Sequence, residues 1–376
     1  MKIGISAELI GTMAGGMETY DYNLINAILS IDNVNQYYIY TGHSHGLQEL
    51  NDTHPNFSFR SFRTTSRWIL IPFSIPWELL RRPVDVFHAT FVPPLICPTK
   101  LVYTVHDIAC LIHPEYFPPL VRYRLSKLIS MGVKKAVKII AVSEATKRDI
   151  VNTFGIDENR ISVIYEGVNS SFRPIQDQKL IKQILQKYRI NSNYILYVGR
   201  FHVRKNLIRL IQAFDIVRKE TNSIPNLVLV GREHYYSTQV FQEIKRLNLK
   251  KYVICPGHVN DGDLPLLYNG AMLFVYPSLF EGFGLPPLEA MACGIPVISS
   301  NCTSLPEILG DAAVLVNPYD INEIADKMYQ LISDESLRKV LIERGFSRIK
   351  MFSWEKTATE TLKIYEEVYL TGLKNI

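Results

Sequence analysis

Short apolar runs alternate with longer helical stretches along most of this chain. The runs are four or five residues long and rich in Val, Ile, Leu and Tyr, as in strands that are buried on both faces. Such strands, separated by helices, predict a parallel sheet that is covered by helices on both sides, and therefore an α/β fold. The expected strands are residues 3–7, 37–40, 84–88, 101–105, 138–142, 161–164, 194–198, 226–230, 252–255, 273–276, 296–299 and 313–316.

The strands form two groups, which predicts two similar α/β domains in series. A chain of 376 residues is too long for one ordinary core. The turn-rich segment 167–174 separates the two groups and is the expected junction. Near the end of the chain, Ala358, Leu362, Tyr365 and Tyr369 have helical spacing and predict one packed face of a helix. The expected boundaries are 1–170, 171–353 and, for the final helix, 354–376.

Composition and cysteine usage indicate a globular protein from a reducing compartment. Hydrophobic residues make up 47% of the chain and charged residues 20%. The five cysteines are scattered without a CxxC pair, which argues against a disulfide framework and a zinc site. The chain enters its first strand without the features of a signal peptide, and no stretch approaches the roughly 20 apolar residues of a membrane span. We therefore expect a cytoplasmic protein.

Positive charge is concentrated in one part of the first domain. The net charge of the chain is +5, whereas residues 60–148 carry fourteen Lys and Arg against five Asp and Glu, a net charge of +9. A local basic surface suits an anionic partner such as a membrane, a lipid pyrophosphate or a charged glycan; a merely solvated surface is an equal alternative. No nucleic-acid motif accompanies these residues, so nucleic acid is not an expected partner.

Residues 120–137 have a basic, amphipathic composition. Five Lys and Arg lie among Leu, Ile and Val, as in helices that bind an anionic interface. A packed helix with a solvated charged face is the alternative. The first interpretation predicts peripheral contact with the inner face of the membrane through the basic segment 60–148.

Residues 281–300 predict a binding loop that leads into a helix and then a strand. Two prolines suit the first turn of that helix, and a glycine suits its end. Glu281 lies in the loop and Glu289 on the helix. Carboxylates accept hydrogen bonds from hydroxyls, and glycine lets a backbone amide approach a ligand closely. A polyhydroxylated ligand fits this segment, whose defining residues are Glu281, Gly282, Gly284, Pro286, Pro287, Glu289 and Gly294.

Gly199, Arg200 and Lys205 follow the first strand of the second domain. Arg offers a planar fork of donors and Lys a movable point charge, and together they suit a diphosphate. Basic residues near a helix start oppose the helix dipole, which is unfavourable unless an anion is bound there. The segment therefore predicts an anion site. For the neighbouring Arg204 we expect simple exposure.

Two segments of the first domain also follow strands, where ligands of open parallel sheets bind. Gly15 and Gly16 precede an expected helix and can present amides to a phosphate, although a plain glycine turn is at least as good an interpretation. His106 and Asp107 end the strand 101–105. A lone histidine is more often structural, and Asp107 either orients the imidazole or caps the following turn.

Asp261 and Asp263 have the DxD spacing of metal-dependent glycosyltransferases. They precede an expected helix start, where aspartates serve as N-caps. We therefore interpret them as helix caps and expect no metal site.

These segments resemble the family 4 glycosyltransferases, which are retaining enzymes. Glu281 and Glu289 look like the paired-glutamate motif of that family, and Gly199, Arg200 and Lys205 match its diphosphate-binding segment. Residues 102–114 and 142–150 look like bacterial mannosyltransferases of polysaccharide synthesis. The resemblance implies the GT-B fold, in which two Rossmann-like parallel-sheet domains face each other across a cleft and the final helix crosses back to the first domain.

The resemblance also assigns a role to each candidate residue. Glu289 would bind the ribose hydroxyls. The sugar hydroxyls would be bound by Glu281 and by the backbone of residues 282–284, which we call the glycine loop. Arg200 and Lys205 would stabilise the leaving diphosphate, and His106 would face the transferred sugar. The implied catalytic residues are His106, Arg200, Lys205 and Glu281, and the implied donor-binding residues are Gly15, Gly16, Gly199, Gly282, Phe283, Gly284, Leu285 and Glu289.

On this resemblance we expect a hexosyltransferase whose donor is a nucleotide-diphosphate sugar, with GDP-mannose favoured and UDP sugars as the alternative. The acceptor would be a hydroxyl of a glycan or lipid-linked oligosaccharide, with no metal or other cofactor. A retaining glycoside hydrolase also uses two carboxylates, but it would not need Arg200 and Lys205. A non-catalytic GT-B subunit would be expected to lose a donor-site residue, and an epimerase on the same fold is excluded only weakly.

Overall fold

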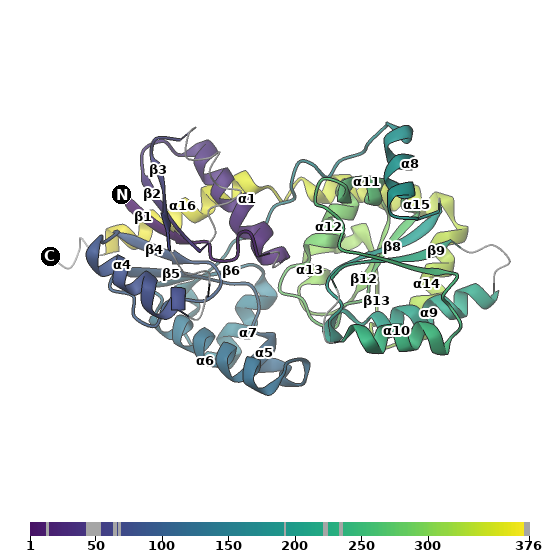
Figure 1. Ribbon diagram of the computed structural model, residues 1–376, viewed down its shortest axis with the longest axis horizontal. Helices are drawn as coiled ribbons and strands as arrows, with labels where there is room; N and C mark the ends of the chain where they lie inside the picture. Colours follow the sequence, from purple (N-terminus) through teal and green to yellow (C-terminus); the bar gives the residue numbers. More distant parts are fainter. Residues whose placement is uncertain are drawn as a thin grey trace. The chain divides into compact units, whose positions relative to one another are not determined.

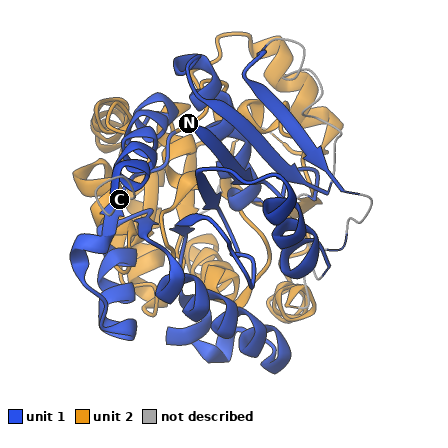
Figure 2. Cartoon of the chain, turned by 90° about the vertical axis from the view of Figure 1, so that its left-hand side faces the viewer, with its two compact units in different colours: residues 1–167, 353–376 blue, residues 168–352 orange. Residues whose placement is uncertain are grey.

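The computed structural model describes residues 1–12, 15–42, 54–62, 66, 69–191, 193–220, 225–232 and 236–371. The chain divides into two compact units, residues 1–167 with 353–376 and residues 168–352 (Figure 2). The breaks therefore fall after residues 167 and 352, instead of after 170 and 353 as expected from the sequence. None of the described helices is both long and apolar enough to cross a membrane.

The first unit is built on a parallel sheet with the strand order β3-β2-β1-β4-β5-β6-β7 (Figure 1). The edge strand β3 was not expected, because Phe alternates there with Ser and Arg, and only Phe57 is fully buried. The strands are β1 Lys2–Ser6, β2 Gln36–Thr41, β3 Phe57–Ser61, β4 Val86–Ala89, β5 Lys100–Val105, β6 Lys138–Ala141 and β7 Ile161–Val163.

Helices cover both faces of this sheet, as the apolar strands require. Strand β5 shows the division, since Val102 belongs to one hydrophobic cluster and Tyr103 to the other. The first cluster includes residues of α1 and α16, and the second includes residues of α4 and α6. The helical segments of this unit are α1 Gly16–Ile31, η1 Leu70–Ser74, α4 Ile75–Arg81, α5 Ala109–Ile112, η2 Pro114–Tyr116, α6 Pro119–Lys135, α7 Glu144–Phe154, η3 Glu158–Arg160 and α16 Trp354–Thr371.

The chain passes between the units twice, at neighbouring positions. The amide of Val168 donates to the carbonyl of Phe352 (3.3 Å) on the side of the second unit. On the side of the first unit, a Cβ atom added to Gly167 would lie 2.2 Å from the backbone nitrogen of Trp354. Glycine is therefore required at 167 by the close approach of two backbones. This contact holds the start of α16 against the end of residues 1–167, the first of the two segments that make up unit 1.

The second unit is a parallel sheet with the order β10-β9-β8-β11-β12-β13, again covered by helices (Figure 1). The strands are β8 Tyr194–Val198, β9 Asn226–Val230, β10 Val253–Gly257, β11 Leu273–Tyr276, β12 Val297–Ser300 and β13 Ala313–Val316. The helical segments are α8 Gln178–Lys187, η4 Val203–Lys205, α9 Leu207–Glu220, α10 Ser237–Arg246, α11 Leu264–Asn269, α12 Leu285–Ala292, α13 Leu305–Leu309, η5 Gly310–Ala312, α14 Ile321–Ser333 and α15 Glu335–Ile349.

Asp261 and Asp263 do not act as helix caps, so that expectation was wrong. Asp263 occupies the N-cap position of α11, but its side chain makes no capping hydrogen bond. Its carboxylate instead accepts from the Nζ of Lys187 (2.5 Å) and the hydroxyl of Tyr188 (2.7 Å). A hydrogen bond to a charged donor is stronger than one to a backbone amide, which explains the preference. Asp261 is exposed and precedes the N-cap by two residues.

Candidate functional site

The turn between β8 and α9 carries the predicted anion-binding residues of unit 2. The amide of Gly199 donates to the carbonyl of Val230 (2.9 Å), which fixes the start of the turn to the neighbouring strand. Arg200 is exposed, whereas Lys205, at the end of η4, is buried with 8% exposure. The two cations therefore differ in environment: one can reach into solvent, and the other is part of the protein interior.

A second loop, between β11 and α12, lies against this turn. The amide of Leu279 donates to the carbonyl of Arg204 (2.7 Å), which joins the two loops directly. Both loops follow the carboxyl ends of adjacent strands, since β8 pairs with β11. This edge of the sheet is where open α/β sheets bind ligands.

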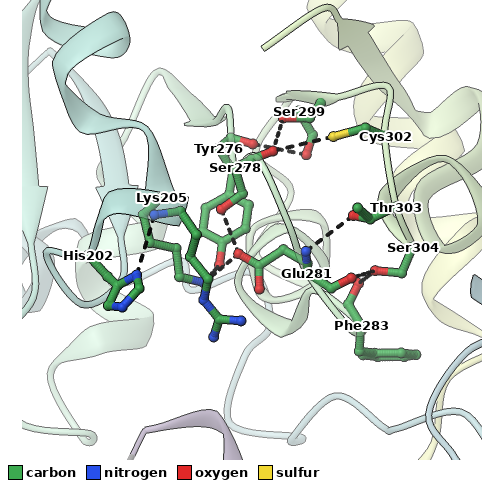
Figure 3. A network of polar contacts seen from close by, with 12 residues as sticks. His202, Lys205, Tyr276, Ser278, Glu281, Phe283, Ser299, Cys302, Thr303 and Ser304 are labelled. Carbon is green, nitrogen blue, oxygen red and sulfur yellow. Dashed lines mark hydrogen bonds and ion pairs between the residues drawn. The ribbon is translucent and has the colours of Figure 1, made fainter. Parts of the chain in front are cut away.

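Lys205 and Glu281 form a buried ion pair between these loops (Figure 3). The Nζ of Lys205 lies 2.5 Å from Oε1 of Glu281 and also donates to the hydroxyl of Tyr276. The hydroxyl of Ser278 donates to the same Oε1 atom (2.5 Å). Burial alone would raise the pKa of Glu281, but the charges of Lys205 and Arg204 and these hydrogen bonds lower it below its usual value. Glu281 is therefore a carboxylate at neutral pH.

Residues after β12 hold the glycine loop in place (Figure 3). The hydroxyl of Ser304 donates to the carbonyls of Glu281 (3.0 Å) and Phe283 (2.8 Å), and the amide of Glu281 donates to the hydroxyl of Thr303 (3.2 Å). Gly284 has a φ of 116° at the N-cap of α12, a conformation that other residues rarely adopt. The shape of the loop is therefore set by backbone contacts.

The remaining loop residues enter the protein interior. Gly282 is buried in the loop, and Phe283 packs edge-on against Phe352, with ring centroids 5.8 Å apart. Leu285 is the first residue of α12 and is also buried. Their side chains therefore support the loop, and only backbone groups of these residues are suited to contact a ligand.

Glu289 lies on α12 and is half-buried. Its Oε2 accepts a hydrogen bond from the hydroxyl of Tyr268 (3.0 Å). Loss of hydration and, less strongly, the charge of Asp261 raise the pKa of Glu289 to about 7. The two glutamates thus differ: Glu281 is ionised, and Glu289 titrates near neutral pH.

Sequence reasoning missed several residues of this site. Ser278 and Tyr276 bond to the Glu281–Lys205 pair, and Ser278 could have been found because it lies two residues after a buried strand. Arg204 is half-buried, and its charge contributes to lowering the pKa of Glu281, so the expectation that it is simply exposed was wrong. Thr303 and Ser304 carried no sequence signal, because their role depends on the approach of two loops.

In unit 1, the two predicted glycines lie at the start of α1. Gly15 is the N-cap of this helix with a φ of 76°, and Gly16 is its first residue. A Cβ atom added at either position would meet no atom of the described residues within 4 Å. The described residues therefore leave space for a ligand beside these glycines. Met13 and Ala14 of the same loop lie outside the described residues.

His106 follows β5 in unit 1, and both of its ring nitrogens are engaged. Nδ1 lies 3.1 Å from Oε1 of Glu166, and Nε2 lies 3.0 Å from the carbonyl oxygen of Thr90. The ring also packs edge-on against Tyr20, with centroids 4.7 Å apart. Asp107 does not orient the imidazole: its Oδ1 accepts from the amide of Ala109 (3.0 Å), so it caps the following turn.

A buried hydrogen-bond chain connects this region to α16. The hydroxyl of Tyr365 bonds to Nδ1 of His88 (2.6 Å), and Nε2 of His88 bonds to the hydroxyl of Thr104 (2.7 Å), which in turn contacts the hydroxyl of Tyr20 (3.1 Å). Burial and the nearby His106 lower the pKa of His88 to about 3, so His88 is neutral. The final helix thus supports Tyr20, which packs on His106.

The arrangement in unit 2 suits a ligand that carries both hydroxyls and negative charge. A buried carboxylate and a half-buried one can accept from hydroxyls, and Arg200, Arg204 and Lys205 provide positive charge at the same turn. Among the residues that the structure describes, no group of three or more His, Cys, Asp and Glu could hold a metal ion.

Two family models match the chain, one in each half. Residues 14–172 match the model described as Glycosyltransferase Family 4, and residues 180–348 match Glycosyl transferases group 1. The chain is 35% identical over 303 residues to the O-antigen chain mannosyltransferase B of Escherichia coli, covering 79% of this chain and 78% of the relative. It is 30% identical over 327 residues to the O-antigen chain mannosyltransferase RfbU of Salmonella typhimurium, covering 84% and 87%.

Solved structures share the fold at low sequence identity. Anabaena HepE in complex with UDP and glucose matches with a TM-score of 0.77 and 19% identity, covering 98% of this chain and all of that chain. WaaG, a glycosyltransferase involved in lipopolysaccharide biosynthesis, matches with a TM-score of 0.76 and 15% identity, covering 97% and 99%. These likenesses confirm the GT-B fold that was expected from the sequence.

Proposed function

The chain belongs to the family 4 glycosyltransferases, and we propose that it transfers mannose from GDP-mannose to a hydroxyl of a glycan or lipid-linked acceptor. Transfer would retain the anomeric configuration and serve surface polysaccharide synthesis. The mannosyltransferase names of the O-antigen relatives support the choice of sugar and of polysaccharide synthesis. The observation that carries the proposal is the buried Lys205–Glu281 pair beside the glycine loop.

In this proposal the leaving diphosphate is stabilised by positive charge at the β8–α9 turn. Arg200 is exposed there, and Lys205 is held in place by Glu281 and Tyr276. Cations that are already oriented stabilise developing negative charge without reorganisation at the moment of reaction. Glu281 and the backbone of the glycine loop would bind the sugar hydroxyls, and Glu289 would bind those of the ribose. A same-face displacement needs no side-chain nucleophile.

Metal independence is part of the proposal, because Arg200 and Lys205 supply the positive charge that a divalent ion supplies elsewhere. The carboxylate of Asp263 is already paired with Lys187. We predict that transfer activity survives excess EDTA. Loss of activity that added magnesium or manganese restores would contradict this, provided that a circular dichroism control shows an unchanged fold.

The donor can be identified by thermal shift with a panel of GDP, UDP, ADP and TDP sugars. A ligand at 100 times its Kd stabilises the folded state by about 2.7 kcal/mol, which is readily measured. We expect GDP-mannose to give the largest shift and to yield a mannosylated product with a glycan acceptor. A larger shift with a UDP sugar would favour the UDP-dependent alternative, for which the UDP complex of HepE is the relevant observation.

Product analysis with the same sugar nucleotides separates the two remaining alternatives. A non-catalytic subunit would bind without turnover, and an epimerase would convert the sugar nucleotide without an acceptor. Either result would replace the proposed transfer reaction.

Peripheral contact with the inner membrane face through residues 60–148 is the last part of the proposal. Helix α6 exposes Leu120, Val121 and Tyr123 near its start, but Ile129 and Val133 further along it are buried in the core. A longer stripe of exposed apolar side chains begins just before η1 and continues along η1 and α4, with spacings of four, four and three residues that keep it on one side. These side chains are Ile69, Phe73, Trp77 and Leu80, each more than half exposed.

Basic residues adjoin this stripe, since Arg81 and Arg82 end α4 and are exposed. Apolar and aromatic side chains beside positive charge suit an anionic lipid interface. We predict flotation with anionic but not neutral vesicles at low salt, reduced by Phe73→Ser with Trp77→Ser. Val34→Ser, at a residue that is 89% exposed, is the matched control. Absence of flotation with anionic vesicles at low salt would favour a soluble acceptor.

A further inference from the structure

Glu166 contacts the predicted catalytic histidine and has no assigned role. It follows β7 and is almost completely buried, with 4% exposure. Its Oε1 lies 3.1 Å from Nδ1 of His106. A buried carboxylate is costly unless it is paired, so this contact calls for an explanation in terms of charge.

The contacts of His106 determine where its protons lie. Nε2 faces the carbonyl oxygen of Thr90, which can only accept, so Nε2 carries a hydrogen atom. The Nδ1···Oε1 contact with Glu166 then needs one further proton, on either the ring or the carboxyl group. Imidazole is more basic than a carboxylate, so the proton belongs to Nδ1. An imidazolium that faces a carboxylate satisfies both contacts.

We propose that Glu166 is a positioning residue that keeps His106 doubly protonated and fixes the plane of its ring. His106 then has no free lone pair and cannot act as a base. It offers a fixed positive charge beyond the carboxyl end of β5. Resting on the proposed function, this charge suits the anionic phosphates of the donor.

The surroundings hold the pair in place from three sides. Tyr20 packs edge-on against the His106 ring, and Trp354 of α16 packs against Tyr20, with centroids 5.7 Å apart. The hydroxyl of Thr146 donates to the carbonyl of His106 (3.2 Å). Glu166 itself precedes Gly167, whose backbone is packed against the start of α16. The anchor of His106 therefore lies where the chain leaves unit 1.

The protonation state can be measured without any substrate. In ¹⁵N spectra of histidine-labelled protein, the signals of His106 are identified by their loss in His106→Gln. We expect two protonated ring nitrogens in the wild type at pH 7.5. In Glu166→Gln we expect a neutral ring with a bare Nδ1, because the amide can donate to that atom. An unprotonated ring nitrogen of His106 in the wild type would overturn the proposal.

Kinetics test the consequence for transfer. We expect Glu166→Gln to lower kcat by at least about tenfold while KM for the acceptor changes little, as for loss of an oriented charge. Glu166→Asp should recover part of the activity. The effects of Glu166→Gln and His106→Gln on kcat should not add, since both variants remove the same His106–Glu166 pair. Unchanged kcat in Glu166→Gln, with the altered spectrum, would show that the charge is not used.

The chain offers a matched control in a second histidine–glutamate pair. Nδ1 of His113 lies 3.0 Å from Oε1 of Glu115, but this pair is solvent-exposed. Glu115→Gln should change neither the His106 signals nor kcat. If transfer activity is absent altogether, the proposed function fails, while the spectra still decide the protonation of His106.

Discussion

The Lys205–Glu281 pair combines a binding role with a structural one. Both side chains are buried, at 8% and 7% exposure, and each has a further hydroxyl partner. Both residues lie in loops that follow strands, where an alanine variant would ordinarily lose activity without unfolding the protein. Their burial changes that expectation, because a charge left without its partner inside the protein is strongly destabilising.

We predict that Lys205→Ala and Glu281→Ala each abolish transfer and also lower the free energy of unfolding, by about 3–5 kcal/mol. The double variant Lys205→Met with Glu281→Gln should recover much of the stability but none of the activity. Urea denaturation and a product assay measure the two effects. Near-normal turnover in either alanine variant, with a verified product, would contradict the assigned roles.

The control is the exposed pair of Lys339 and Glu335 on α15, whose nitrogen and oxygen lie 2.7 Å apart. Solvent screens such a pair, so Lys339→Ala should leave both stability and activity unchanged.

The raised pKa of Glu289 predicts that nucleotide binding depends on pH. Its pKa is raised from 4.5 to about 7, so the folded protein keeps a proton that the unfolded chain has lost between these values. Its contribution to stability therefore falls as the pH rises through this window. Since an ionised carboxylate accepts hydroxyl hydrogen bonds better, nucleotide affinity should rise by up to about tenfold from pH 6 to 8.

Calorimetric titration across this pH range tests the prediction. Glu289→Gln should bind more weakly and lose the pH dependence, and Glu220→Gln, at an exposed position of α9, should behave as the wild type. An equally steep pH profile in Glu289→Gln would assign the titration to another group.

At the scale of elements, the start of α16 depends on the contact with Gly167. The backbone nitrogen of Trp354 occupies the space that a Cβ atom at residue 167 would need. The hydroxyl of Thr357 donates to the carbonyl of Tyr165 (2.7 Å) just beside it. These contacts attach the first turn of α16 to the end of the segment that follows β7.

We predict that Gly167→Ala destabilises unit 1 by about 1–3 kcal/mol, because backbone atoms cannot move aside as a flexible side chain can. Gly262→Ala is the control, since a Cβ atom there meets no atom within 4 Å in the part of the chain that the structure describes. Urea melts of the two variants give the comparison. Equal stability of Gly167→Ala and wild type would show that the close approach is readily relieved.

At the scale of the whole molecule, α16 joins the end of the described chain to unit 1. Its buried residues belong to the same hydrophobic cluster as α1 and the strands β1 and β2. Burying a large apolar side chain contributes roughly 1.5–3 kcal/mol, so the contribution of the helix is of the same order as the usual net stability of a domain. Unit 1 is therefore complete only when the final residues return to it.

We predict that truncation after residue 353 abolishes the cooperative unfolding of unit 1 but leaves that of unit 2, as measured by calorimetry and limited proteolysis. Truncation after Thr371, which keeps α16 whole, is the control. Two unchanged transitions after removal of α16 would show that unit 1 folds without it.

The sequence by itself determined the two parallel sheets and the position of the polar segments after their strands. These features follow from local patterns, since burial on both faces gives continuous apolar runs and the strand ends are where the runs stop. The half-buried edge strand β3 was missed for the same reason, because its alternating residues do not form such a run.

The tertiary structure alone decided which polar groups meet. Lys205 and Glu281 are 76 residues apart, His106 and Glu166 are 60 apart, and neither pairing has a local pattern. The same is true of Asp263, where a distant Lys187 replaced the helix cap that local rules favoured. Charge pairs depend on burial and on the approach of separate loops, and these arise only when the chain packs.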